Sequence, residues 1–205
     1  LILCAGGYDR TFDIASQYHD GKAIIVIEQV AGEGKQAALR KCLPRATGEI
    51  IYLTDSDCLL NDDAFIRLIA PIVKGEYEAV NGTSHPLKTQ QNNAFVMYQW
   101  TVDHYAHARA PEHSSGLLGR NCAVSAQALR QTGGFDEEAK SGTDYTLARQ
   151  LIDNGYTIYN EKYSSVETEY PSSLRSYYYK RTRWLRNTIV LGYKKKDYGS
   201  MLPSL

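Results

Sequence analysis

Short apolar runs and longer segments of helical periodicity alternate along the first third of the chain. The runs are nearly continuous, as in strands that are buried on both faces of a sheet. The longer segments place apolar residues three and four positions apart, as on the inner face of a helix. Strands are therefore predicted at residues 1–4, 23–28, 49–54 and 79–82, and helices at residues 10–19, 33–43 and 62–73. This order predicts an α/β fold with a mostly parallel sheet flanked by helices, whose ligands bind beyond the carboxyl ends of the strands.

The pattern is less regular in the second half of the chain. Helices are predicted at residues 94–110, 143–154 and 172–191, and a short strand at residues 156–159. Residues 116–126 mix glycine with short apolar stretches, and the pattern predicts no element there. No internal repeat or linker interrupts the sequence, so residues 1–205 are interpreted as one domain with two lobes, residues 1–83 and 84–205.

Charge is balanced overall but concentrated in one segment. The formal net charge is +0 and the pI is about 7.1, so bulk charge indicates no nucleic-acid partner. Residues 175–196 nevertheless carry several arginines and lysines and no acid. This segment is expected to meet an anionic group, such as a diphosphate, a phospholipid or an acidic glycan. A solvated basic helix is the alternative.

The cysteine spacing and the hydropathy indicate in which cellular compartment the protein is expected. The four cysteines, Cys4, Cys42, Cys58 and Cys122, show no paired spacing, which favours free thiols in a reducing compartment. No apolar run approaches the ~18 residues of a membrane-spanning helix, and no signal peptide is recognisable. The chain begins inside an apolar run at Leu1, so we expect further sequence to precede it.

Two carboxylates follow the strand that is predicted at residues 49–54. Asp55 and Asp57 are two positions apart, and residues i and i+2 of a strand point to the same face. If the chain bends just after Asp55, both could meet one divalent cation and the oxygens of a diphosphate, because hard oxygen ligands suit Mg²⁺, Mn²⁺ or Ca²⁺. This favours a metal-dependent enzyme with a nucleotide-activated donor. Alternatively, the two acids cap the helix at residues 62–73 and open a polar loop.

Two further candidates lie at the starts of predicted helices. Lys35 could hold a phosphate there, because helix N-termini are positive, although no glycine loop of the Walker type surrounds it. A surface lysine is the alternative. Asp144 could take a proton from a hydroxyl as a general base, or it could cap its own helix.

The predicted helices of the second half carry the remaining candidates. Arg181 and Arg183 offer planar guanidinium groups that suit a diphosphate. Trp184 offers a flat face to a sugar ring, or it packs in the core. His104 and His107 lie one turn apart without an acid in a zinc-binding pattern, which favours a partly exposed helix face.

The order of these segments resembles that of a family 2 glycosyltransferase with the GT-A fold. The matching segments are residues 6–11 (Gly-Gly-Tyr-Asp-Arg-Thr, against Gly-Ser-x-Asp-x-Thr in the family), 34–39 (against Gly-Lys-x-x-Ala-Leu), 46–57 (the strand and the Asp-x-Asp metal motif), 133–147 (against Gly-Gly-Phe and Glu-Asp) and 169–184. The last segment is similar to the Gln-x-x-Arg-Trp region of membrane-bound cellulose, chitin and hyaluronan synthases. Each match is short, but all five occur in the family's order over nearly the whole chain.

The resemblance implies roles on the donor side of the reaction. Asp55 and Asp57 would bind the nucleotide diphosphate and its metal, usually Mg²⁺ or Mn²⁺. Lys35 would help to hold the nucleotide. Arg181 and Arg183 would grip the diphosphate leaving group. The expected donor is a nucleotide-sugar, most simply a UDP-sugar.

The resemblance also implies roles on the acceptor side. Asp144 would be the base of an inverting single displacement, Gly119 would line the acceptor path and Trp184 would face the acceptor sugar. Residues 1–83 would form a nucleotide-binding lobe, and residues 84–205 an acceptor lobe that ends in a basic interfacial helix. The expected acceptor is a glycan or a lipid, and the expected location is the cytoplasmic face of a membrane.

The sequence departs from the family at three points. Lys180 replaces the Gln of Gln-x-x-Arg-Trp, Thr143 replaces the acid before the catalytic Asp, and the family's first strand is absent, so that Cys4 and Ala5 stand where an acid usually contacts the base. Two alternatives therefore stay open, a sugar nucleotidyltransferase and a catalytically incomplete binding module. Metal-dependent UDP binding and release of free UDP would separate these functions.

Overall fold

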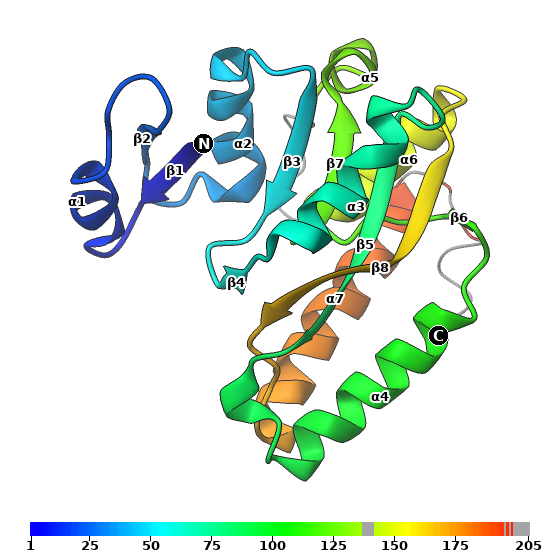
Figure 1. The fold of residues 1–205 in the computed structure, drawn as a ribbon. Helices are drawn as coiled ribbons and strands as arrows, with labels where there is room; N and C mark the ends of the chain where they lie inside the picture. Colours follow the sequence, from blue (N-terminus) through cyan, green and yellow to red (C-terminus); the bar gives the residue numbers. More distant parts are fainter. Residues whose placement is uncertain (137–141, 195, 197, 199–205) are drawn as a thin grey trace.

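The computed structural model describes residues 1–136, 142–194, 196 and 198. At the N-terminus, strands β1 (Ile2–Gly6) and β2 (Ile25–Gln29) pair in parallel and form a two-stranded sheet. Helices α1 (Thr11–Ser16) and α2 (Gly34–Cys42) pack against these strands (Figure 1).

The larger sheet has the order β3-β7-β5-β8-β4, and β6 pairs with β8 beside this path. Its strands are β3 (Ile50–Thr54), β4 (Cys58–Leu59), β5 (Ala79–Pro86), β6 (His113–Ser114), β7 (Asn121–Ser125) and β8 (Ile158–Thr168). Strand β5 runs parallel to β8, but β7 runs antiparallel to both β3 and β5, and β4 and β6 run antiparallel to β8. The sheet is therefore mixed, and the prediction of a mostly parallel sheet is wrong. The antiparallel β7 lies within residues 116–126, where the sequence pattern predicts no element.

The remaining helices agree with the sequence pattern except at one point. They are α3 (Asp62–Val73), α4 (Ala94–Ala108), α5 (Ala126–Gln131), α6 (Thr143–Asp153) and α7 (Leu174–Lys194), with short 3-10 helices η1 (Leu43–Arg45) and η2 (Lys88–Gln90). Among the α-helices of the described residues, only α5, which follows β7 directly, is not predicted. Strand β8 is longer than predicted because it contains buried polar residues, which the apolar pattern does not include. Hydrogen bonds satisfy them: Asn160 accepts from Asn81 at 3.0 Å, and Ser164 donates to the Ala64 carbonyl at 2.8 Å.

The core has two layers, one on each face of the larger sheet. On one face, Leu68 of α3 packs with Val80 and Ala123. On the other face, residues of α5 and α6 pack with Cys122 and Val124. Consecutive residues of β7 thus alternate between the two layers, as the pleat of a strand requires. Because both faces of the sheet are covered, the ends of its strands are the places open to ligands.

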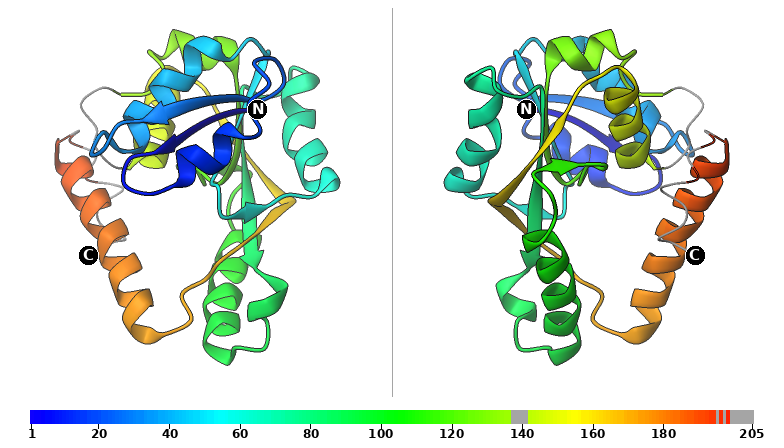
Figure 2. Two further views of the ribbon diagram at one scale, coloured as in Figure 1. Left: turned by 90° about the vertical axis from the view of Figure 1, so that its left-hand side faces the viewer. Right: turned by 90° about the vertical axis from the view of Figure 1, so that its right-hand side faces the viewer.

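Helices α4 and α7 project together from the body of the molecule. Both run from its lower end toward the sheet (Figures 1 and 2). They meet near their N-terminal ends, where the Phe95 and Tyr177 rings pack edge to face with centroids 5.8 Å apart and Gln99 donates to the Pro171 carbonyl at 2.8 Å. The boundary between the two expected lobes, after residue 83, falls inside β5. No helix in the described part of the chain is both long enough and apolar enough to span a membrane.

Candidate active site

The Asp-x-Asp motif forms a turn between β3 and β4. The Cys58 amide donates to the Asp55 carbonyl at 3.2 Å and closes this turn. The chain therefore bends directly after Asp55, and this turn holds both carboxylates at the end of β3. They do not cap α3, because the side chain of Asn61 does so and accepts from the Ala64 amide at 2.7 Å. Asp57 is exposed to solvent.

Lys35 of helix α2 forms an ion pair with this turn. Its ammonium lies 2.5 Å from a carboxylate oxygen of Asp55. Burial lowers the pKa of Lys35, but the hydrogen bond and negative charge of Asp55, together with the charge of Asp144, outweigh it and leave that pKa raised. Lys35 therefore remains a cation beside both acids, a position from which it can also meet a phosphate.

Asp144 is held by the loop before β7. Its helix, α6, has no side-chain cap, and Asp144 instead accepts a hydrogen bond from the Gly119 amide at 3.2 Å. A Cβ atom on Gly119 would lie 2.3 Å from Oδ1 of Asp144, so only glycine permits this approach. The capping alternative is thus not supported, and Gly119 acts on Asp144 directly.

A small cavity joins these groups at the end of β3. It is lined by Lys35, Leu39, Leu53, Thr54, Leu117, Gly119, Cys122, Thr143, Asp144 and Leu147. One ammonium and one carboxylate thus face a largely apolar surface, where electrostatic interactions are stronger than in water. Cys122 is fully buried here, and burial together with the charge of Asp144 raises its thiol pKa. The thiol is therefore unsuited to act as a nucleophile.

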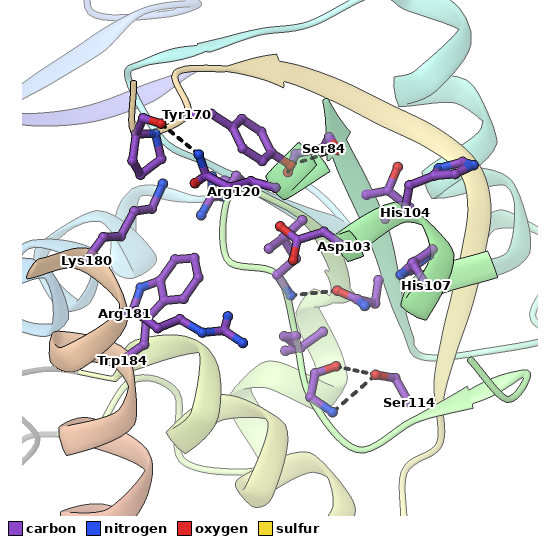
Figure 3. Close-up of a pocket in the computed structure, with 18 of the residues that line it drawn as sticks. Ser84, Asp103, His104, His107, Ser114, Arg120, Tyr170, Lys180, Arg181 and Trp184 are labelled. Carbon is purple, nitrogen blue, oxygen red and sulfur yellow. Dashed lines mark hydrogen bonds between the residues drawn. The ribbon is translucent and has the colours of Figure 1, made fainter. Parts of the chain in front are cut away.

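A second cavity of about 450 Å³ lies between α4 and α7. Figure 3 shows residues of both helices along it. From α7, Lys180, Arg181 and Trp184 line the cavity. Trp184 is 37% exposed, so it does not pack in the core. Leu117 lines this cavity and the small one, so the two adjoin, whereas Arg183 is exposed and lines neither.

Three residues of the larger cavity were not predicted to belong to a site: the sequence analysis does not single out Asp103 or Arg120, and it places His107 only on a partly exposed helix face. The side chain of Asp103 is accessible to solvent, yet partial burial of its carboxyl raises its pKa. The positive charges of Arg181, Lys180 and Arg120 act in the opposite direction. Arg120 follows Gly119 directly, which is the one local signal that could have found it. The third is His107, whose pKa is lowered by burial and by Lys162. Its Nε2 is buried and has no hydrogen-bond partner among the described residues.

The two acids of the turn suit a metal that arrives with a nucleotide. In the described part of the chain, no three His, Cys, Asp or Glu side chains gather as a complete metal site. Mg²⁺ characteristically takes one or two carboxylates and completes its shell with phosphate oxygens and water. The oxygens of Asp55 and Asp57 match that donor set, and Mn²⁺ accepts the same ligands.

Three solved structures with similar folds identify the fold of this chain. The mannosyltransferase PcManGT from Pyrobaculum calidifontis, in complex with GDP-Man and Mn²⁺, has a TM-score of 0.64 at 21% identity, with 90% of this chain and 51% of that chain covered. GalNAc-T7 with UDP, GalNAc and Mn²⁺ has a TM-score of 0.60 at 13% identity, with 86% and 40% covered. TarS 1–349 of S. aureus, in complex with UDP-GlcNAc, has a TM-score of 0.58 at 14% identity, with 85% and 50% covered. The fold is thus confirmed as the GT-A fold.

Sequence comparison identifies the family. The model described as "Glycosyltransferase like family 2" matches residues 1–187, and the chain belongs to this family. The beta-monoglucosyldiacylglycerol synthases of Trichormus variabilis and of a Nostoc species are each 25% identical over 196 residues, which cover 93% of this chain. The chain spans 40% of the length of these two relatives. The narrower resemblance to membrane-bound processive synthases stays a prediction.

Proposed function

We propose that this chain transfers a sugar from a UDP-sugar to a glycan or lipid acceptor by a metal-dependent, inverting single displacement. One observation carries the proposal. Lys35, paired with Asp55, and Asp144, held by Gly119, line a small cavity that adjoins a larger one. The three solved structures named above contain nucleotides or nucleotide-sugars, which favours the same kind of donor here.

On the donor side, the residues around the turn hold the diphosphate. Asp55 and Asp57 would bind it together with Mg²⁺ or Mn²⁺, which when bound neutralises charge on the leaving oxygen. Lys35 lies beside Asp55 and adds a fixed positive charge. Arg181 and Arg183 would donate hydrogen bonds to the departing diphosphate from α7. The lobe of residues 1–83 would thus bind the nucleotide.

On the acceptor side, Asp144 would act as the general base. Its carboxylate takes the proton of the acceptor hydroxyl while the hydroxyl oxygen bonds to the anomeric carbon and the bond from that carbon to the diphosphate breaks. The attack comes from the opposite face, so the configuration inverts. The Gly119 amide holds one oxygen of Asp144 and fixes its orientation. Trp184 would stack on the acceptor sugar in the lobe of residues 84–205.

Helix α7 would bind the cytoplasmic face of a membrane that contains anionic lipids. Tyr178, Tyr179 and Tyr193 are exposed, and the helix carries six arginines and lysines and no acid. Such residues favour the interface, and each cation near an anionic surface contributes about 1 kcal/mol. Sedimentation with vesicles of phosphatidylglycerol and phosphatidylcholine should recover the protein at low salt and leave it in solution at 0.5 M NaCl. Equal binding to pure phosphatidylcholine would contradict this role.

Isothermal titration with UDP, ADP and GDP, each with and without Mn²⁺, tests the proposed function. We expect binding that requires the metal and prefers UDP, followed by release of free UDP when a UDP-sugar and an acceptor are supplied. Binding of UDP without any release would favour a binding module. Consumption of a sugar phosphate and a nucleoside triphosphate would favour a nucleotidyltransferase. Absence of all nucleotide binding would contradict the proposal.

A further inference from the structure

The cavity between α4 and α7 holds more positive charge than its surroundings neutralise. Its fully charged lining residues are Arg120, Lys180, Arg181 and Asp103. Among the described residues, no carboxylate lies within ion-pair distance of these three cations, and none of the three side chains donates a hydrogen bond. Both guanidinium groups therefore keep their donors available for a ligand.

Neighbouring cations also act on Lys180. Burial lowers the pKa of Lys180, and the charges of Arg120 and Arg183 lower it further, while Asp57 and Asp103 act in the opposite direction. The ring of Trp184 brings two of the cations together: Nζ of Lys180 lies 5.3 Å from its centroid and Cζ of Arg120 lies 5.9 Å away. Like charges held this close in a partly buried site repel, and a bound anion would relieve that repulsion.

Position 180 departs from the synthase motif that residues 169–184 resemble. That motif has a neutral Gln there, and this chain has Lys180. The change adds a positive charge beside Arg120 and Arg181. A Gln amide can donate and accept hydrogen bonds with a sugar hydroxyl, whereas an ammonium only donates and is best satisfied by an anion.

The donor's own diphosphate has a different place in the proposed function. Asp144 and Lys35 line the small cavity, and Asp55 pairs with Lys35 at its edge. The larger cavity adjoins it through Leu117, on the side where the acceptor would enter. Of the cations that line the larger cavity, the proposed function gives Arg181 to the departing diphosphate, so the charge at Arg120 and Lys180 is left for the acceptor.

We propose that the cavity between α4 and α7 recognises a phosphate group on the acceptor. This inference rests on the proposed function and specifies its acceptor. Arg120 would give the phosphate paired hydrogen bonds, and Lys180 would add a point charge. The buried Nε2 of His107, which has no partner among the described residues, offers a further polar contact to the headgroup.

Titration with two soluble short-chain lipids tests this proposal. Dihexanoyl phosphatidate and dihexanoylglycerol differ only in the phosphate, and both are titrated below their micelle concentrations, with UDP and Mn²⁺ saturating the donor site. Inorganic phosphate is titrated in parallel. We expect phosphatidate to bind at least about 10-fold more tightly than dihexanoylglycerol and than inorganic phosphate.

Three charge-removing variants locate the binding. Arg120→Gln and Lys180→Gln, each of which replaces a cation by a neutral amide, should each weaken phosphatidate binding by about 10-fold or more. Arg186→Gln removes the same charge from an exposed position of α7 outside the cavity and should leave phosphatidate binding within about 2-fold. Thermal unfolding midpoints close to that of the unmodified protein would show that the variants are folded.

Three results would overturn the inference: equal affinity for the two lipids, equal affinity for inorganic phosphate and phosphatidate, or equal losses in Arg120→Gln and Arg186→Gln. UDP titrations on the unmodified protein separate this failure from a failure of the proposed function. If UDP does not bind, the transferase proposal itself fails. If UDP binds with its metal but phosphatidate binds no more tightly than dihexanoylglycerol, only the inference about the acceptor fails.

Discussion

Replacing Gly119 by alanine would displace the candidate base without removing it. The added Cβ would lie 2.3 Å from Oδ1 and 2.7 Å from Cγ of Asp144. An ordinary carbon–oxygen contact is about 3.5 Å, so the carboxylate would have to move by about 1 Å. The backbone of Gly119 is not left-handed, so alanine meets no conformational strain there, and the clash acts alone.

The expected effect on activity is far larger than the effect on stability. A misplacement of about 1 Å in a reacting group costs on the order of 100-fold in rate, which corresponds to about 2.7 kcal/mol. The variant also loses the hydrogen bond from the Gly119 amide to Asp144. Because Asp144 is only partly buried, its carboxylate can turn toward water, and the free energy of unfolding should fall by only about 1 kcal/mol.

The assay is the steady-state release of UDP, with urea unfolding and UDP titration of the same samples. Gly116→Ala is the matched control, since it adds the same methyl group nearby in the chain, at a glycine where a Cβ would meet nothing within 4 Å. We expect Gly119→Ala to lose about 100-fold in rate and about 1 kcal/mol in the free energy of unfolding, and to keep its UDP affinity, whereas Gly116→Ala should change none of the three. If Gly119→Ala released UDP as fast as Gly116→Ala, the position of Asp144 would not matter for the reaction, and its assignment as the base would be wrong.

Three further substitutions test other parts of the site and fold. Asp144→Asn should keep UDP affinity within about 2-fold and lower transfer by about 10³-fold, because the amide cannot accept the proton; near-normal transfer would rule out the base. Asp57→Ala should abolish the Mn²⁺-dependence of UDP binding in isothermal titration, and undiminished dependence would remove its metal role. Asn121→Ala should lower the free energy of unfolding in urea by about 3 kcal/mol, because Asn121 is fully buried and donates to the Thr83 and Ser164 carbonyls at 2.9 and 3.1 Å. A loss below about 1 kcal/mol would show that these carbonyls find other partners.

Local pattern was sufficient where an element is defined by its own residues. Helix α3 has the predicted bounds Asp62–Val73, because its apolar spacing and its Asn61 cap are both short-range features. Strand β7 was not predicted from the sequence, although each of its residues is buried. A five-residue strand, Asn121–Ser125, that begins and ends with polar residues has no periodicity of its own and is defined by β3 and β5 on either side. Its antiparallel direction follows from the same pairing and makes the sheet mixed.

The candidate site divides in the same way. The sequence by itself determined the chemical groups: the acids Asp55, Asp57 and Asp144, the cation Lys35, and the basic helix that carries Trp184. Family resemblance supplied an order for these pieces, and the family match over residues 1–187 confirms it. None of this required knowing which groups touch, since composition and spacing along the chain are properties of short segments.

Only the tertiary structure decided which of these groups meet. Lys35 and Asp55 are 20 positions apart, and Gly119 and Asp144 are 25 apart. Arg120 and Asp103 became part of the site only when α4 and α7 were placed around one cavity. Contacts of this kind depend on how the helices pack on both faces of the sheet, and packing is a property of the whole chain that no local pattern records.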